Sequence, residues 1–218
     1  SPDVILFFSG KDSIAALIQM RRFWDKRRIH LVHGYLVPGL KHIEEPMREY
    51  ERIFGQHIIM VPHPFLPVVL REYVYQTEAN CDVIDAIADR YLVEYSWDDI
   101  SEIVIHQLGL APSTWSALGV TRYDSQNRWS SFKRFGAANH KRRVFYPIFD
   151  WPLARILEEI ARSGWKLPPF YRAYGRSLDG LDYRFTDPMS RFFPEDFALL
   201  KQWFPLIEAE ILKIRWRE

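Results

Sequence analysis

The chain begins with an apolar run and continues with apolar residues at helical spacing. Residues 4–8 are all apolar, which is typical of a strand buried on both faces of a parallel sheet. After a short polar stretch at residues 9–13, apolar side chains recur every three or four residues from Ile14 onward. The pattern predicts a strand, a tight turn of small residues and a helix.

The next segments repeat this alternation. Residues 29–36 and 56–61 have strand character, and residues 42–54 between them have helical spacing and stop before a glycine. The order β-α-β-α-β predicts parallel strands with right-handed helical crossovers. Ligands bind such sheets at the carboxyl ends of the strands, where residues 9–13 and 37–41 are expected to lie.

The remainder predicts a second half of the same sheet. We expect a single α/β domain of three layers, α/β/α, around a mostly parallel, five-stranded sheet. Its parts are a first half over residues 1–61, a helical insertion over 65–110, a second half over 115–190 and a C-terminal helix over 194–215. Within these parts the pattern predicts helices at 81–95, 97–108 and 150–163, strands at 115–121 and 144–148, and a long loop at 167–186.

Composition narrows the class of protein. Hydrophobic residues make up 48% of the chain and the formal net charge is +1, which favours a folded, soluble protein and gives no evidence for direct nucleic-acid binding. No run of about 20 apolar residues is present, and the first residues lack the pattern of a signal peptide. We therefore expect a cytoplasmic protein without a membrane partner.

Cysteine usage excludes several kinds of site. Cys81 is the only cysteine in the sequence. We therefore expect no internal disulfide, no iron–sulfur cluster and no structural zinc site. Cys81 itself either packs at the start of a helix or is a reactive thiol near a helix N-terminus.

The polar stretch after the first strand has the chemistry of an anion site. A helix that follows a turn of Ser and Gly presents backbone N–H groups and the positive end of its dipole to a phosphate. Gly10 allows close approach, while Ser9, Lys11 and Ser13 add hydroxyl and ammonium donors. The stretch is not a Walker A loop, which needs a second glycine. The alternative is that Asp12 or Ser13 merely caps a buried helix.

This stretch resembles the S-G-G-x-D-S loop of the PP-loop ATP pyrophosphatases and of their relatives, the phosphoadenylyl-sulfate (PAPS) reductases. Aligned on the Asp-Ser pair at positions 12 and 13, the two glycines of the family correspond to Ser9 and Gly10, and its leading serine to Phe8. The resemblance implies the following phosphate-binding residues: Phe8, Ser9, Gly10, Lys11, Asp12 and Ser13.

A second constellation follows the predicted fourth strand. Arg122 and Arg128 flank Asp124 and Ser125, so two guanidinium groups and a hydroxyl could converge on phosphate or sulfate oxygens. The alternative is a capped surface turn in which Asp124 pairs with one arginine. The segment starting at Gly119 is similar to the G-x-R-x-x-E-S-x-x-R stretch of the PAPS reductases, with Asp in place of Glu, which favours the anion-binding interpretation.

Two further segments resemble that family in the same order, and three positions depart from it. Residues 146–151 are similar to its P-I-x-D-W segment, and residues 167–171 to its L-P-x-x-x-L-Y loop. However, residues 177–182 and 214–218 lack the cysteines of the family, and Val37-Pro38-Gly39 stands where the family has Asp-Thr-Gly. The resemblance implies the fold and a nucleotide contact at Gly39, whereas the missing thiol argues against reduction by an internal nucleophile.

The first functional hypothesis is an ATP pyrophosphatase-type enzyme that uses Mg-ATP to adenylylate an unknown second substrate. It needs no cysteine, because the attacking group belongs to the substrate. Lys11 holds the pyrophosphate and Asp12 helps to hold Mg²⁺, whereas Ser125 and the arginines neutralise the leaving group. Its catalytic residues are Lys11, Asp12, Arg122 and Arg128.

Two other hypotheses stay open. A transferase or reductase could bind PAPS and use an external thiol, with Lys141 and Arg142 binding the 3′-phosphate; alternatively, this basic run is a solvated turn. The third hypothesis is a nucleotide-binding protein without catalysis, working with a partner protein or as a homodimer. The second substrate is expected at residues 65–110 and 167–186.

Overall fold

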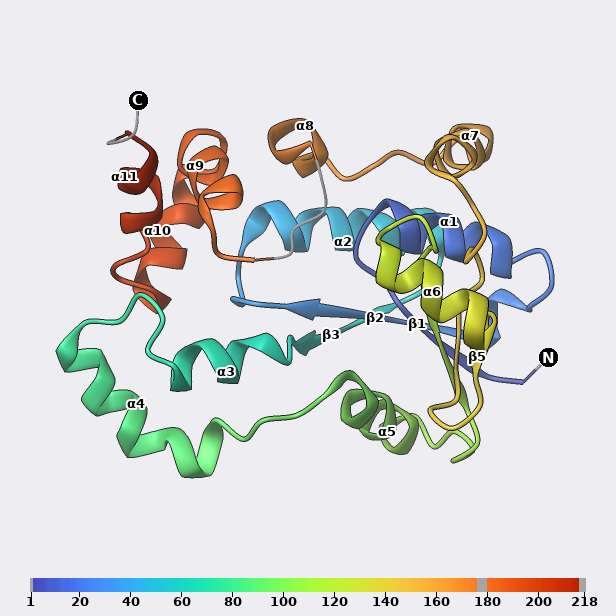
Figure 1. The fold of residues 1–218 in the computed structure, drawn as a ribbon, viewed down its shortest axis with the longest axis horizontal. Helices are drawn as coiled ribbons and strands as arrows, with labels where there is room; N and C mark the ends of the chain where they lie inside the picture. The colour runs from blue at the N-terminus through green and yellow to red at the C-terminus, as the bar shows by residue number, and fades with distance from the viewer. Residues whose placement is uncertain (1, 176–179, 216–218) are drawn as a thin grey trace. The chain divides into compact units, whose positions relative to one another are not determined.

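The computed structural model describes residues 2–175 and 180–215 (Figure 1). The chain divides into two compact units, each built from three segments. The first unit comprises Ser1–Gly34, Tyr50–Val61 and Trp97–Pro168, and the second comprises Tyr35–Glu49, Pro62–Ser96 and Pro169–Glu218.

A mostly parallel sheet of six strands confirms the predicted α/β class, with the strand order β3-β2-β1-β4-β6-β5. The central strand β1 pairs in parallel with β2 and β4, so that Val4 lies opposite Ile29 and Trp115. β6 is parallel to β4, and β5 is antiparallel to β6. The strands are β1 Val4–Phe7, β2 Ile29–Tyr35, β3 Ile58–Pro62, β4 Trp115–Leu118, β5 Ala138–Asn139 and β6 Val144–Phe145.

Helices cover both faces of this sheet. Successive side chains of a strand point to opposite faces. Phe7 contacts Trp97 of α5, with ring centroids 4.8 Å apart, while Phe8 contacts Tyr50 and Phe54 of α2 at 5.4 and 5.6 Å. The first unit therefore has the predicted three-layer arrangement. The helices are α1 Lys11–Met20, α2 Lys41–Phe54, α3 Phe65–Arg71, α4 Glu78–Tyr91, α5 Trp97–Gln107, α6 Gln126–Phe135, α7 Leu153–Ser163, α8 Phe170–Tyr174, α9 Tyr183–Phe192, α10 Pro194–Trp203 and α11 Ala209–Arg215, with a 3₁₀ turn at Lys26–Arg28.

Three sequence predictions need correction. The single helix expected at 194–215 is two helices, α10 and α11, because Pro205 cannot donate a helical hydrogen bond. The loop expected at 167–186 contains α8 and the start of α9; residues 176–179 lie outside the described part. The strands expected at 115–121 and 144–148 end at Leu118 and Phe145, and the short strand β5 was not predicted.

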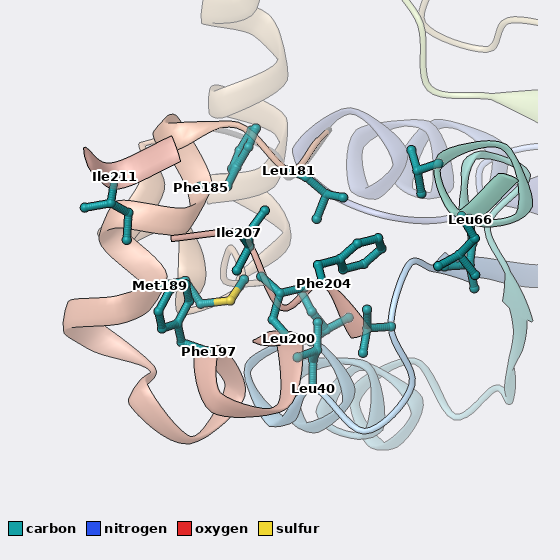
Figure 2. Packing of buried hydrophobic residues seen from close by; sticks show 14 of the residues in the cluster. Leu40, Leu66, Leu181, Phe185, Met189, Phe197, Leu200, Phe204, Ile207 and Ile211 are labelled. Atoms are coloured by element: carbon teal, nitrogen blue, oxygen red, sulfur yellow. The ribbon is translucent and has the colours of Figure 1, made fainter. Parts of the chain in front are cut away.

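The second unit has a hydrophobic core of its own (Figure 2). Most of the labelled side chains come from residues 181–211, which include α9, α10 and the start of α11, and Leu40 and Leu66 join them from elsewhere in the unit. Apolar residues recur every three or four positions along the expected C-terminal helix, and those that are buried are Phe197, Leu200, Phe204, Ile207 and Ile211. The side chain of Ile214 lies outside the described part.

A buried polar chain also links three helices of the second unit. Both oxygens of Asp196 in α10 accept hydrogen bonds from the backbone N–H groups of Lys41 and His42, at 2.8 Å each. The same carboxylate contacts His42 Nδ1, and the Tyr174 hydroxyl lies 3.3 Å from His42 Nε2. Asp196 thus caps the start of α2 from a distant position in the sequence.

Candidate functional site

The end of β1 is fixed by its neighbour β2. The Phe8 N–H donates to the Val32 carbonyl at 2.7 Å, and His33 Nδ1 lies 2.8 Å from the Phe8 carbonyl oxygen. Burial lowers the pKa of His33, so the neutral ring donates to this carbonyl. The Phe8 side chain is buried among aromatic rings. Phe8 therefore offers the site its backbone, not its side chain.

Ser13 closes the loop that follows. Its Oγ accepts from the N–H groups of Ser9 and Gly10, at 2.8 and 3.0 Å, and donates to the Gly10 carbonyl at 2.8 Å. Ser13 is buried, whereas Ser9 is exposed. The role of Ser13 in this structure is to shape the turn before α1.

Lys11 and Asp12 form an ion pair at the first turn of α1. The ammonium Nζ lies 2.9 and 2.7 Å from the two carboxylate oxygens of Asp12. Burial raises the pKa of Asp12 and Lys11 opposes that rise; the charge of Asp124 adds to the rise and that of Arg128 opposes it. Two segments more than a hundred residues apart in sequence therefore act on one carboxyl group.

Gly119 shows how closely these segments pack. A Cβ atom at this position would lie 2.6 Å from the Asp12 carbonyl carbon and the Ser13 nitrogen, and 2.7 Å from the Asp12 oxygen. Backbone atoms cannot give way as a flexible side chain does. Glycine at 119 thus allows the end of β4 to lie against the first turn of α1.

Arg122 is held by aromatic rings and keeps one donor unused. Its N–H donates to the Phe149 carbonyl at 2.8 Å, which fixes the backbone. The guanidinium carbon lies 5.0 Å from the ring centre of Tyr123 and 4.7 Å from that of Trp129, and Nη2 donates to the Tyr123 hydroxyl at 2.9 Å. Its Nε is buried without a hydrogen-bond partner. Such an orphan donor is costly unless an acceptor binds it.

The next turn has the contacts of the capped-turn alternative. Asp124 accepts from the Thr121 N–H at 2.9 Å and pairs with Arg128 at 2.5 Å. Ser125 Oγ accepts from the Arg128 N–H at 3.2 Å and caps α6. These contacts hold Arg128 within this turn and leave Ser125 as a cap, while the effect of Arg128 on the pKa of Asp12 relates it to the loop.

Two predicted residues of the first unit, Lys141 and Arg142, are not brought to this loop. Residues 140–143 precede β6, and the Arg143 carbonyl accepts from the Ser116 N–H near the start of β4. Because β1, β4 and β6 are parallel, Lys141 and Arg142 lie at the end of the strands opposite the loop. Arg142 binds Asp98 through two 2.8 Å hydrogen bonds. This agrees with the solvated-turn alternative.

Gly39, for which the resemblance implies a nucleotide contact, belongs to the second unit. Its φ is +86°, a conformation that favours glycine, and its N–H donates to Glu44 Oε1 at 2.7 Å. Its local role is a turn before α2.

The sequence interpretation missed three residues that support the site. His33 was given no part in the site, although it anchors the Phe8 carbonyl. Tyr123 and Trp129 were not connected with Arg122. Their only sequence signal is an arginine with aromatic residues one and seven positions later, which many surface segments share.

The comparisons with known proteins rest on structure. No protein-family model matches the chain, and no curated protein matches it significantly. The fold is similar to that of the U34-tRNA thiolase NcsA from Methanococcus maripaludis, solved with its [4Fe-4S] cluster, at 15% identity and a TM-score of 0.48, covering 95% of this chain and 72% of that one. It is also similar to a PAPS reductase from Candida auris in a phosphate complex, at 12% identity and a TM-score of 0.47, covering 82% of each chain.

Two searches of the described residues found nothing. No group of three or more His, Cys, Asp or Glu side chains there could hold a metal ion. No helix in the described ranges is long and apolar enough to cross a membrane. Residues 177–179 and 216–218, where the family resemblance shows missing cysteines, lie outside the described part.

The arrangement in the first unit can bind an anion. A ten-residue helix begins at the loop, Lys11 supplies an ammonium group, and Arg122 offers an unused buried donor. The Asp12 carboxylate lies at the same turn of α1, and it can contribute one ligand to a cation that a phosphate group carries.

Proposed function

We propose that the chain binds an adenine nucleotide at residues 8–13 and uses Mg-ATP to adenylylate a second substrate, releasing pyrophosphate. The observation that carries this proposal is the close approach of Gly119 to Asp12 and Ser13, because it places the arginine segment beside the loop. The effect of Asp124 and Arg128 on the pKa of Asp12 supports the same convergence.

Lys11 and Asp12 exchange partners in this proposal. Without ligand, their charges neutralise each other across 2.7 Å. When a triphosphate binds, Lys11 turns to its oxygens, and Asp12 contributes a ligand to the accompanying Mg²⁺, which offsets phosphate charge. The pair keeps both groups positioned and avoids an isolated charge in a partly buried place.

The arginines act on the leaving group. As the attacking group of the substrate forms a bond to the α-phosphorus, the bond to the bridging oxygen breaks and negative charge moves onto pyrophosphate. Arg122, held by two rings, and Arg128, at the first turn of α6, are positioned to offset this charge. The attacking nucleophile belongs to the second substrate.

The described residues favour ATP over PAPS. The PAPS hypothesis assigned the 3′-phosphate to Lys141 and Arg142, and these residues lie at the other end of the strands. Binding of nucleotide without any turnover would instead favour the non-catalytic hypothesis.

Matched pairs of variants test the proposal. We expect Lys11→Ala and Arg122→Ala to weaken Mg-ATP binding about 10- to 100-fold, because each removes a charged contact with phosphate. Lys141→Ala and Arg142→Ala remove the same side-chain types from the opposite end of the strands, and we expect wild-type affinity. Equilibrium dialysis with labelled ATP measures all four. Equal affinity in the two pairs contradicts the proposal.

A further inference from the structure

We propose that the chain associates with a second copy of itself, with the outer surface of α4 in one copy docking on the outer surface of α6 in the other. The inference does not rest on the proposed function, although Arg122 and Arg128 belong both to the proposed nucleotide site and to the second surface. It rests on two exposed surfaces that match each other in apolar content and in charge.

The first surface is on α4. Val83, Ile87 and Tyr91 are 60%, 39% and 66% exposed, and their spacing of four residues places them on one stripe of the helix. The buried residue of this helix is Ile84. A soluble helix normally directs one apolar stripe to the core, so a second stripe facing outward indicates a contact surface. We call residues 78–94 with this stripe the α4 surface.

The α4 surface is strongly acidic. Residues 78–94 contain five acidic residues and one basic residue, Arg90, for a net charge of −4. Two such surfaces facing each other would repel, so a symmetric α4–α4 contact is disfavoured. The acidic residues are Glu78, Asp82, Asp85, Asp89 and Glu94.

The second surface is on α6. None of the residues of α6 is buried, although the helix is rich in aromatic side chains. Tyr123, Trp129 and Phe135 are 49%, 45% and 65% exposed, and we call residues 122–135 the α6 surface. This surface has four basic residues and one acidic residue, for a net charge of +3; the basic residues are Arg122, Arg128, Lys133 and Arg134.

The two surfaces are complementary. Within residues 78–94 the exposed large apolar side chains are Val83, Ile87, Tyr91 and Val93, and the α6 surface presents three; the charges around them have opposite signs on the two surfaces. Opposite charges steer encounter and fix orientation, while the apolar side chains supply the contact energy. Both surfaces are present on every copy of the chain, which is why a second copy is the occupant that the described residues favour.

The association is expected to be weak and sensitive to salt. Stable interfaces bury about 1,200–2,000 Å² in total, and one pair of helices of this length buries less. Charges on exposed surfaces are screened over about 10 Å at 0.1 M salt. A contact between two different surfaces gives a closed dimer only if the α4 surface of each copy binds the α6 surface of the other. If only one such contact forms, further copies add to the free surfaces and an open chain of copies results.

Sedimentation velocity over a wide concentration range tests the proposal. We expect the wild-type chain to sediment faster as concentration rises at about 50 mM NaCl, and this effect to be largely lost at about 500 mM. V83S/Y91S, on the α4 surface, and K133E/R134E, on the α6 surface, are each expected to stay monomeric. Leu153→Ser, which removes a 54% exposed apolar side chain of α7, is the matched control and should behave like wild type.

Mixing the two variants distinguishes this contact from a symmetric one. V83S/Y91S keeps an intact α6 surface and K133E/R134E an intact α4 surface, so the mixture is expected to form a heterodimer although neither variant associates alone. Adding D82K/D89K to K133E/R134E should restore self-association by exchanging the charges. A wild-type chain that is monomeric at all concentrations overturns the proposal, as do variants that still self-associate or a mixture that does not.

Discussion

Adding one methyl group at Gly119 tests the geometry of the site. In Gly119→Ala, the Cβ meets backbone atoms of α1 at 2.6–2.7 Å, so the first turn of α1 has to move. We expect a loss of stability of about 1–3 kcal/mol and nucleotide binding weakened at least about tenfold. Urea unfolding and ATP binding measure the two effects.

Gly180 is the matched control for this substitution. A Cβ there would meet its nearest atoms at 3.6 and 3.9 Å, which is ordinary contact. We expect Gly180→Ala to change stability by less than about 0.5 kcal/mol and to leave nucleotide binding unchanged. If the two variants bind ATP equally, the loop and the arginine segment do not form one site.

His33 makes stability depend on pH. Burial lowers its pKa below the ordinary value of 6.5, whereas the unfolded chain takes up the proton near 6.5. The unfolded state then binds more protons as pH falls, so stability is full above about 6.5 and decreases below it, by at most about 1.4 kcal/mol per pH unit for each such histidine. The pKa of His42 is also lowered, mainly by burial and despite Asp196, and it acts in the same direction.

Replacing His33 measures how much of the pH dependence of stability comes from this residue. We expect His33→Gln to lose less stability than wild type between pH 7.5 and 5.5, in urea unfolding at both pH values. His106→Gln, which changes an exposed histidine, should keep the wild-type dependence. A His33→Gln variant with an unchanged pH dependence would show that this ring is not the group that titrates.

Individual residues also show which parts of the site could be predicted from the sequence and which could not. The loop at residues 9–13 and the arginine segment could be recognised because each is continuous in sequence. The sequence did not show that the Ser13 side chain turns back to the loop, because this depends on the local geometry of the turn. It also did not show that Lys141 and Arg142 lie at the other end of the strands, because this depends on β6 running parallel to β4. Phe8 was misleading because its side chain follows the alternation of β1 and packs in the core.

At the scale of elements, the start of α2 depends on a carboxylate from α10. Asp196→Ala leaves the N–H groups of Lys41 and His42 without their acceptor and His42 without its partner. We expect a loss of about 2–4 kcal/mol in the free energy of unfolding. Glu195→Ala removes a neighbouring, exposed partner of Lys41 and should cost less than about 0.5 kcal/mol. Equal losses of stability in the two variants would show that Asp196 does not cap α2.

Elements were predicted well where periodicity was long. The strands β1, β2 and β3 and the helix α5 match the expected segments within two residues, while α4 begins three residues and ends four residues earlier than expected. The two-residue strand β5 carries no periodic signal, and α6 was not predicted, because polar and charged residues dominate it. The break between α10 and α11 was predictable from Pro205, which the regular apolar stripe concealed.

At the scale of the whole molecule, a net charge of +1 hides two surfaces of opposite sign. The overall charge does not favour binding to a charged partner, but the α4 and α6 surfaces carry net charges of −4 and +3 within short segments. Average composition therefore describes solubility and does not describe interaction. Local charge has to be counted on exposed elements, which requires knowing which residues are exposed.

The central claim is that the first unit is an adenine-nucleotide site, and a calorimetric titration of the purified chain tests it most directly. Mg-ATP and PAPS are titrated separately at one salt concentration. The account predicts saturable binding of Mg-ATP at one site per chain, with weaker binding of PAPS. Absence of binding by either nucleotide would contradict it, and PAPS binding more tightly than ATP would contradict the assignment of the reaction to ATP.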